Sequence, residues 1–179
     1  MKRIITAGFL LATLTSFAAC GSTATSPTTT TTTTTLPSSY TFTATLLPAN
    51  EVPAVSNAEA AGTGTVTITM PVTRDSAGSI TSATATFQVT LTGFPAGMTL
   101  TGAHIHNGVA GNTAPVLVNT GLASGEIVLT NGSTTFTKSN INVAVDTAQN
   151  LVSGANGFYF NVHSTLNTGG VARGQLTKQ

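Results

Sequence analysis

Apolar and polar positions alternate along most of the chain beyond about residue 40. The segments YTFTATL at 40–46, GTVTITM at 64–70 and ITSATATFQVTL at 80–91 place threonines and apolar side chains on opposite faces. A period of two with many β-branched residues is the pattern of half-buried strands. Each segment is therefore predicted to be a strand with one face toward a core.

Shorter segments of the same kind follow, separated by glycine, asparagine and proline. The Asn131-Gly132 dipeptide between two of them predicts a two-residue hairpin. The further predicted strands are LTGAHIH at 100–106, PVLVN at 115–119, GEIVLT at 125–130, STTFTK at 133–138, GFYFNVH at 157–163 and VARGQLT at 171–177.

One segment departs from the alternation. SNINVAVDTAQNLVSG at 139–154 places four apolar residues at successive spacings of four, three and four, which is a helical period. It predicts one short helix near 140–152, capped by Ser139 or Asn140 and ended by Gly154. With about eight or nine short strands, the predicted fold class is all-β, an antiparallel β-sandwich or barrel.

The N-terminus has the features of an export signal. Lys2 and Arg3 precede an apolar stretch at 4–14, which is shorter than the ~20 apolar residues that a membrane-spanning helix needs. Small residues then lead to Cys20, the only cysteine of the chain. We predict that residues 1–19 form a signal peptide.

Cys20 is a candidate lipidation site. Its surroundings resemble a bacterial lipobox, although Phe17 stands where leucine is usual. The resemblance implies a lipid anchor on Cys20, and Gly21 favours the outer membrane of a Gram-negative host. The predicted location is therefore the outer membrane or cell surface, facing the periplasm or the exterior. The alternative is ordinary signal cleavage beside an incidental cysteine.

Composition divides the remaining chain into a tether and one domain. Residues 20–39 are polar and contain an unbroken threonine run at 28–35. This segment has too little apolar surface to offset the conformational entropy lost on ordering, so it is predicted to be a flexible tether. Residues 40–179 have the size of one domain, with four basic and five acidic side chains and a net charge of about −1. No basic stripe is present, which argues against nucleic acid as a partner.

The three histidines are the candidate chemistry. In a strand at 100–106, His104 and His106 share a face, with Cα atoms ~6.6 Å apart. The same alternation at 157–163 separates His163 from the phenylalanines of that strand. If the two strands are neighbours, three imidazoles converge on one polar surface.

Three imidazoles on rigid strands suit copper or zinc. The alternative is structural, with the imidazoles hydrogen-bonded to loop backbone and holding the turn at 107–115. Both interpretations remain open from the sequence.

Glu51 and Arg173 are charged residues in apolar or turn-rich surroundings. Buried charges require partners, so we consider a Glu51–Arg173 ion pair that ties the first loop to the last strand. In the alternative, each side chain is exposed.

Several motifs together resemble one family. EVP at 51–53, HIH at 104–106, NVHS at 161–164 and RGQL at 173–176 are similar, in this order, to the marks of the chordin-type (CHRD) domain, with Ser164 in place of the usual threonine. The family includes chordin, an extracellular antagonist of bone morphogenetic proteins, and stand-alone exported bacterial domains. The growth-factor role is not carried over, because a fold does not fix a function.

A weaker similarity links GAHIHNG at 102–108 to the His-x-His segment of copper–zinc superoxide dismutases. It implies an immunoglobulin-like or superoxide-dismutase-like sandwich, with His104, His106 and His163 as copper ligands and Arg173 as a guide for an anion. The chain departs from that family, which binds copper with four histidines and has a zinc site and an internal disulfide.

The predicted function is binding rather than catalysis, because the spacing identifies no nucleophile–base pair and no carboxylate dyad. The chain is interpreted as a membrane-anchored module that holds a protein, a glycan or a transition metal. One alternative is a copper-dependent redox enzyme resembling superoxide dismutase. The other is a structural envelope protein whose histidines brace loops.

Overall fold

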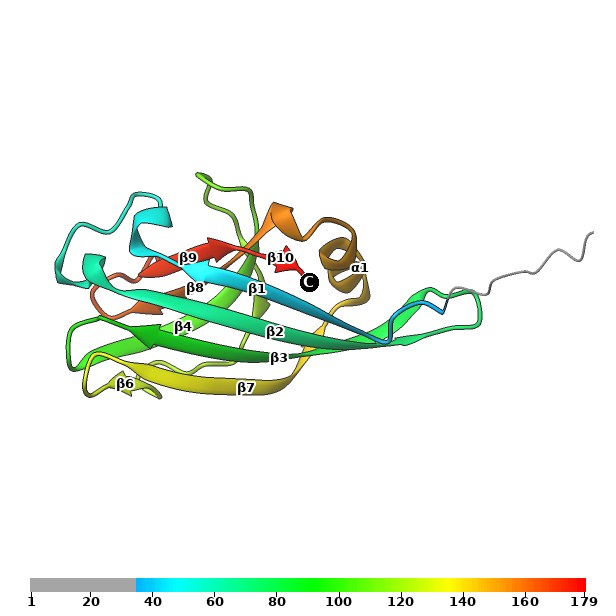
Figure 1. Cartoon of the computed structure of the whole chain (residues 1–179), viewed down its shortest axis with the longest axis horizontal. Helices are drawn as coiled ribbons and strands as arrows, with labels where there is room; N and C mark the ends of the chain where they lie inside the picture. The colour runs from blue at the N-terminus through cyan, green and yellow to red at the C-terminus, as the bar shows by residue number, and fades with distance from the viewer. Residues whose placement is uncertain (1–34) are drawn as a thin grey trace, which may run out of the picture. The chain divides into compact units, whose positions relative to one another are not determined.

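Two antiparallel sheets face each other in the computed structural model, which describes residues 35–179 (Figure 1). The first sheet has the strand order β10-β1-β2-β3-β7. Its strands are β1 (Ser39–Leu46), β2 (Thr63–Arg74), β3 (Ile80–Thr92), β7 (Thr134–Val143) and β10 (Thr177–Lys178).

The second sheet has the order β5-β4-β8-β9, and β6 pairs with β4 beside it. Its strands are β4 (Met98–Asn107), β5 (Val116–Asn119), β6 (Val128–Leu129), β8 (Phe158–Ser164) and β9 (Ala172–Gln175). The helices are α1 (Val145–Gly154) and the short 3₁₀ turns η1 (Pro48–Asn50), η2 (Ala58–Ala61) and η3 (Ala155–Gly157). The predicted all-β sandwich is confirmed, and the two sheets do not close into a barrel.

The core lies between the sheets and follows the predicted alternation. Phe42, Phe87 and Phe160 are fully buried, and the rings of Phe87 and Phe160 stack across the sheets with centroids 5.8 Å apart. Burying one such side chain contributes roughly 1.5–3 kcal/mol.

Threonines cover the outward face of the first sheet. The register places Thr45 beside Thr65, Thr65 beside Thr90, and Thr90 beside Thr135. A β-branched hydroxyl residue suits an exposed strand position because it favours extended backbone and remains solvated. This row shows how a chain with only 6% charged residues presents a polar surface.

The helix begins later than predicted. Residues up to Val143 belong to β7, where Ala83 pairs with Val143 and Ala85 with Ile141. The helical spacing counted from Ile141 therefore included a strand residue, and the predicted cap at Ser139 or Asn140 is wrong. Pairing with β3 provides backbone hydrogen bonds that the first helical turn would otherwise lack.

The predicted hairpin at Asn131-Gly132 is also wrong. The turn is present, but β6 pairs with β4 while β7 pairs with β3, so the turn joins the two sheets. Leu129 is fully buried, and Phe94 donates its backbone N–H to the Gly132 carbonyl. Packing of Leu129 in the core thus favours pairing of β6 with β4 over the pairing of β6 with β7 that the turn sequence predicts.

The last predicted strand, 171–177, is two strands in the structure. β9 pairs with β8 in the second sheet, and β10 pairs with β1 in the first. Leu176 between them is fully buried, so the chain crosses from one sheet to the other at this residue. An isolated bridge between Leu47 and Arg173 joins the sheets along the same edge.

The predicted signal peptide, Cys20 and most of the predicted tether lie outside the described residues. Within residues 35–179, no helix is both long and apolar enough to span a bilayer.

Candidate metal centre and its surroundings

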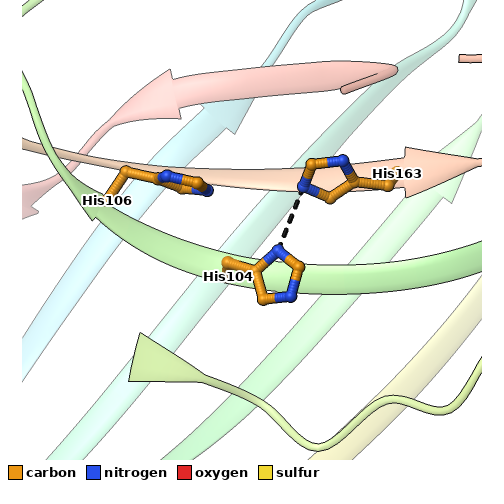
Figure 2. Close-up of side chains that lie close together, drawn as sticks. All are labelled: His104, His106 and His163. Carbon is orange, nitrogen blue, oxygen red and sulfur yellow. Dashed lines mark hydrogen bonds between the residues drawn. The ribbon is translucent and has the colours of Figure 1, made fainter. Parts of the chain in front are cut away.

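The three histidines converge on the face of the second sheet that points away from the core. β4 and β8 are antiparallel neighbours, with His104 opposite Asn161 and Gly102 opposite His163. The intervening Ile105 is turned inward and is 1% exposed. Strand alternation therefore places His104 and His106 on the same outward face as His163, as Figure 2 shows.

The imidazoles form a compact cluster. One ring nitrogen from each histidine lies within 4.8 Å of the others. The closest pair is Nδ1 of His104 and Nε2 of His163, 3.0 Å apart. The ring centroids of His106 lie 5.8 Å from His104 and 6.4 Å from His163. The sequence prediction that these side chains meet therefore agrees with the structure.

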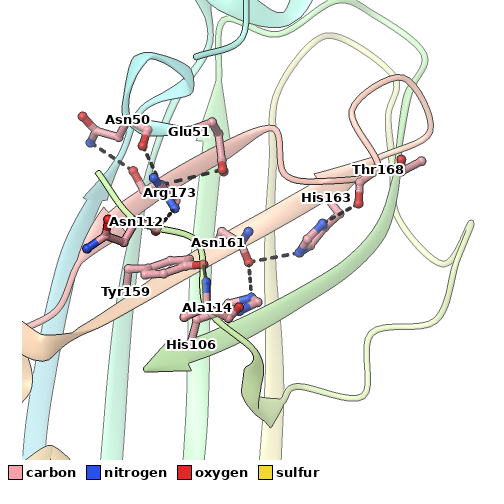
Figure 3. Close-up of polar contacts among 10 residues, drawn as sticks. All are labelled: Asn50, Glu51, His106, Asn112, Ala114, Tyr159, Asn161, His163, Thr168 and Arg173. Carbon is pink, nitrogen blue, oxygen red and sulfur yellow. Dashed lines mark hydrogen bonds and ion pairs between the residues drawn. The ribbon is translucent and has the colours of Figure 1, made fainter. Parts of the chain in front are cut away.

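Two of the histidines also brace loops. Nδ1 of His106 donates to the Ala114 carbonyl at 2.7 Å, and Nδ1 of His163 donates to the Thr168 carbonyl at 2.9 Å (Figure 3). A carbonyl only accepts, so each Nδ1 carries the proton and each Nε2 keeps its lone pair. Ligating histidines in metal sites are oriented by the same kind of hydrogen bond from the second ring nitrogen.

Asn161 lies between Nε2 of His106 and Nε2 of His163. Its side-chain Oδ1 is placed 3.0 Å from each of these two nitrogens. Because both nitrogens are acceptors in this tautomer, they favour the amide orientation that presents the NH₂ group to them. Asn161 therefore satisfies these lone pairs when no metal is bound.

Burial favours the neutral forms of His104 and His163. Burial, together with the smaller effects of the neighbouring His163 and His106, lowers the pKa of His104 to about 4. Burial also lowers the pKa of His163, against an opposing contribution from its bond to Thr168. Neutral imidazole is the form that binds a metal ion.

The donor set fits a transition metal after a small adjustment. Two nitrogens bound to one zinc ion are at most about 4.2 Å apart, twice the metal–nitrogen distance. The cluster spans up to 4.8 Å, so a modest side-chain rotation brings the nitrogens within range. His104 is partly exposed, and its ring is hydrogen-bonded to His163 and to no described loop carbonyl, so it can rotate without releasing a loop.

Arg173 lies opposite Asn161 in the register of β8 and β9, and its guanidinium belongs to a buried network on the far side of the Tyr159 ring from His106. The Tyr159 ring stacks on His106 at 4.7 Å and 3°, and the Arg173 guanidinium lies 4.7 Å from the same ring. Tyr159 is on β8, between the strands that carry the other two residues. Arg173 therefore does not face the histidine cluster directly, as an anion guide to a bound metal would.

Glu51 lies beside Arg173. Its Oε2 is 3.7 Å from Arg173 Nε, and both side chains are buried (Figure 3). The guanidinium also donates to the carbonyls of Asn50 at 2.5 Å and Asn112 at 2.9 Å. Burial raises the pKa of Glu51 to about 7, and the positive charge of Arg173 opposes this rise.

Side chains from the second sheet hold the loop at 108–115 over the histidine face. Gln175 donates to the Gly108 carbonyl at 3.1 Å, Arg173 to Asn112 and His106 to Ala114. This loop covers a face that alternation alone would leave to solvent. Tyr159 and Asn161 are consequently 3% and 2% exposed.

Sequence reasoning missed several residues that shape the site. Strand alternation indicates that Tyr159 and Asn161 share a face with His163. Their contacts with His106 and Arg173 could not be predicted, because those residues lie on neighbouring strands. The buried Glu59 accepts from Ser164 at 2.6 Å and also from Asn167, linking η2 to the loop at 165–171. No local pattern marks Glu59, because its partners are 105 and 108 residues away.

Comparison with known proteins identifies the family of the chain. The model of the CHRD domain matches residues 42–176 of the 179. Searches of the curated proteins and of the solved structures found no match. The matched segment includes both strands that carry the histidines, the Glu51 loop and Arg173. The chain is therefore a member of the CHRD-domain family.

Proposed function

We propose that this chain is a CHRD-domain binding module that holds a transition metal ion, copper in the first instance, through His104, His106 and His163. One observation carries the proposal. Two of the three rings use Nδ1 to hold a loop carbonyl and present Nε2 to a common point. Loop bracing and metal binding are thus compatible roles of the same side chains.

The surroundings of the cluster support holding an ion rather than turning over a substrate. The rival redox interpretation requires Arg173 to attract an anion toward the metal. The Tyr159 ring lies between Arg173 and His106, and Arg173 is 3% exposed. When bound, copper would supply Lewis acidity or one-electron chemistry, while the described residues position it.

A copper titration of the purified full-length chain tests the proposal. We expect one equivalent to bind with a Kd of about micromolar or tighter, as suits three oriented imidazoles. Zinc titrated in parallel determines the preferred metal. A chain that binds neither metal, or binds only weakly, contradicts the metal proposal and leaves the structural interpretation.

Asparagine substitutions separate the two roles of the histidines. The amide of asparagine reaches the position of Nδ1 but not that of Nε2, so His163→Asn can still donate to Thr168 while losing the ligand atom. We expect His163→Asn to fold like the wild type and to bind copper far more weakly. His104→Ala removes the third ligand without touching a loop brace. Undiminished copper binding by both variants would rule out this site.

We also propose that the module is exported and anchored at the bacterial envelope through lipid on Cys20. The apolar N-terminal stretch and the lipobox-like sequence support this proposal. In a bacterial host, Cys20→Ser should move the protein from the membrane fraction to the soluble extracytoplasmic fraction. Ser22→Ala, which leaves the cysteine intact, is the control. Equal membrane association of Cys20→Ser and the wild type would contradict the anchor.

A further inference from the structure

A cavity of about 460 Å³ lies beside the Arg173 network, outside the histidine cluster. Its walls are formed by three segments that are distant in the sequence: the η1 loop, the loop at 108–115 and β9. Its apolar wall includes Ala49, Val52 and Ala110, while Glu51 and Arg173 are its charged residues. A mostly apolar cavity with a few fixed polar groups is the usual form of a small-molecule site.

Two polar atoms of this cavity lack hydrogen-bond partners. Among the residues that the structure describes, Oε1 of Glu51 and Nη2 of Arg173 are the buried side-chain polar atoms without a partner. Glu51 is 7% exposed and Arg173 is 3% exposed, so solvent does not satisfy them. Leaving such groups unpaired costs about 1–3 kcal/mol each, and more when they are charged.

The remaining atoms of the two side chains are fixed, so they cannot easily turn to pair fully with each other. Arg173 Nε and Nη1 are held by the carbonyls of Asn50 and Asn112. On the other side of the carboxylate, Gly170 approaches so closely that a Cβ there would lie 2.6 Å from Oε2. One donor and one acceptor therefore remain unpaired on two residues that line the cavity.

We propose that this cavity binds a neutral sugar, whose adjacent hydroxyl groups pair with Glu51 Oε1 and Arg173 Nη2. One hydroxyl oxygen accepts from the guanidinium, and its neighbour donates to the carboxylate. The cavity is large enough for one monosaccharide unit. This site is distinct from the proposed metal centre, since Tyr159 separates Arg173 from His106.

The charge of the site favours hydroxyl groups over a charged ligand. When Glu51 is ionised, its carboxylate and the Arg173 guanidinium together carry no net charge, so an anion is repelled by Glu51 and a cation by Arg173. The pKa of Glu51 is raised to about 7 by burial, so near neutral pH the carboxyl group is present in both forms. A hydroxyl can donate to the ionised form and accept from the protonated form, which a carboxylate or an ammonium group cannot do.

The outer wall of the cavity is formed in part by exposed residues of the loop at 108–115. Ala110 and Gly111 are exposed, and nothing lies within 4 Å of a Cβ placed on Gly111. The cavity is therefore open to solvent on this side. An ordered water bridging the two atoms is the competing explanation, and it predicts no sugar binding.

The test is a titration of the full-length chain with glucose, galactose, mannose and N-acetylglucosamine in the presence of EDTA. Binding is measured by ligand-detected NMR and by calorimetry. The chelator makes the result independent of the metal proposal. We expect at least one sugar to bind, and Glu51→Leu to weaken that binding about tenfold, the effect of losing one buried hydrogen bond. Acetate and acetamide serve as charged and amide probes.

A second variant tests the cavity independently, in case Glu51→Leu does not fold. Ala110→Trp fills the cavity from an exposed position, and Ala77→Trp places the same side chain on the distant β2–β3 turn as a control. We expect Ala110→Trp to abolish binding and Ala77→Trp to retain it. Absence of binding to every sugar, binding of acetate in preference to sugars, or equal sugar binding by Ala110→Trp and the wild type would each overturn the proposal.

Discussion

Single residues in this domain serve two partners at once. His106 and His163 each direct one ring nitrogen to a loop carbonyl and the other toward the centre of the cluster. Arg173 likewise holds Asn50 and Asn112 while facing Glu51. Such double use explains why the sequence alone could not decide between a metal-binding and a structural role for the histidines.

Glu51 provides a prediction at this scale. Its pKa is raised from 4.5 to about 7 in the folded domain, so its contribution to stability is fully present below pH 4.5 and is lost as the pH rises through 7. The contribution amounts to roughly 3 kcal/mol at most. Urea denaturation across this pH range should show a fall in unfolding free energy for the wild type relative to Glu51→Gln. Parallel pH profiles for the two proteins would contradict the assignment.

At the scale of elements, β9 connects the sheets through close backbone contact. It pairs with β8, while Leu47 and Arg173 bridge to the first sheet. Gly174 makes this approach feasible, because a Cβ at that position would collide with the carbonyl oxygen of Thr45. The carbonyl belongs to β1 backbone and cannot rotate away as a flexible side chain would.

Gly174→Ala should therefore separate β9 from β1 and destabilise the domain. We expect the unfolding free energy to fall by about 1–3 kcal/mol or more, the usual range for overpacking a tight site. Gly157→Ala is the matched control, since nothing lies within 4 Å of a Cβ placed there. The measurement is the denaturation midpoint of each variant. An unchanged midpoint in Gly174→Ala would show that the strands can move apart without cost.

At the scale of the whole molecule, the two sheets present different outward faces. The first sheet exposes rows of threonine, whereas loops cover part of the outward face of the second sheet and bury His106, Asn161 and Arg173. The proposed metal centre lies on β4 and β8, next to the loops that contain Ala114 and Thr168. A bound ion would tie these parts together in the folded state alone, so it should stabilise the entire domain.

Thermal unfolding tests this global effect. A ligand present at 100 times its Kd contributes about 2.7 kcal/mol to stability. We expect copper, or zinc if that metal is preferred, to raise the Tm by roughly 5–11 °C in the wild type at this concentration. EDTA should reverse the shift, and His163→Asn should show none. An equal shift in His163→Asn would place the binding elsewhere in the chain.

Most strands could be predicted from the sequence because alternation is a local property. The segments 40–46 and 80–91 lie within a residue or two of β1 and β3. The same rule placed His104 and His106 on one face. The helix start and the Asn131-Gly132 hairpin were wrong because pairing partners, and not the local pattern, determined those segments.

The sequence by itself determined which side chains share a face of each strand, and with that the candidate ligands. Only the tertiary structure decided that β4 and β8 are neighbours and that loops bury the histidine face. The physical reason is distance along the chain. Arg173 holds carbonyls 61 and 123 residues away, and His104 meets His163 across 59 residues. Contacts of this range arise from sheet order and loop docking, which no local period encodes.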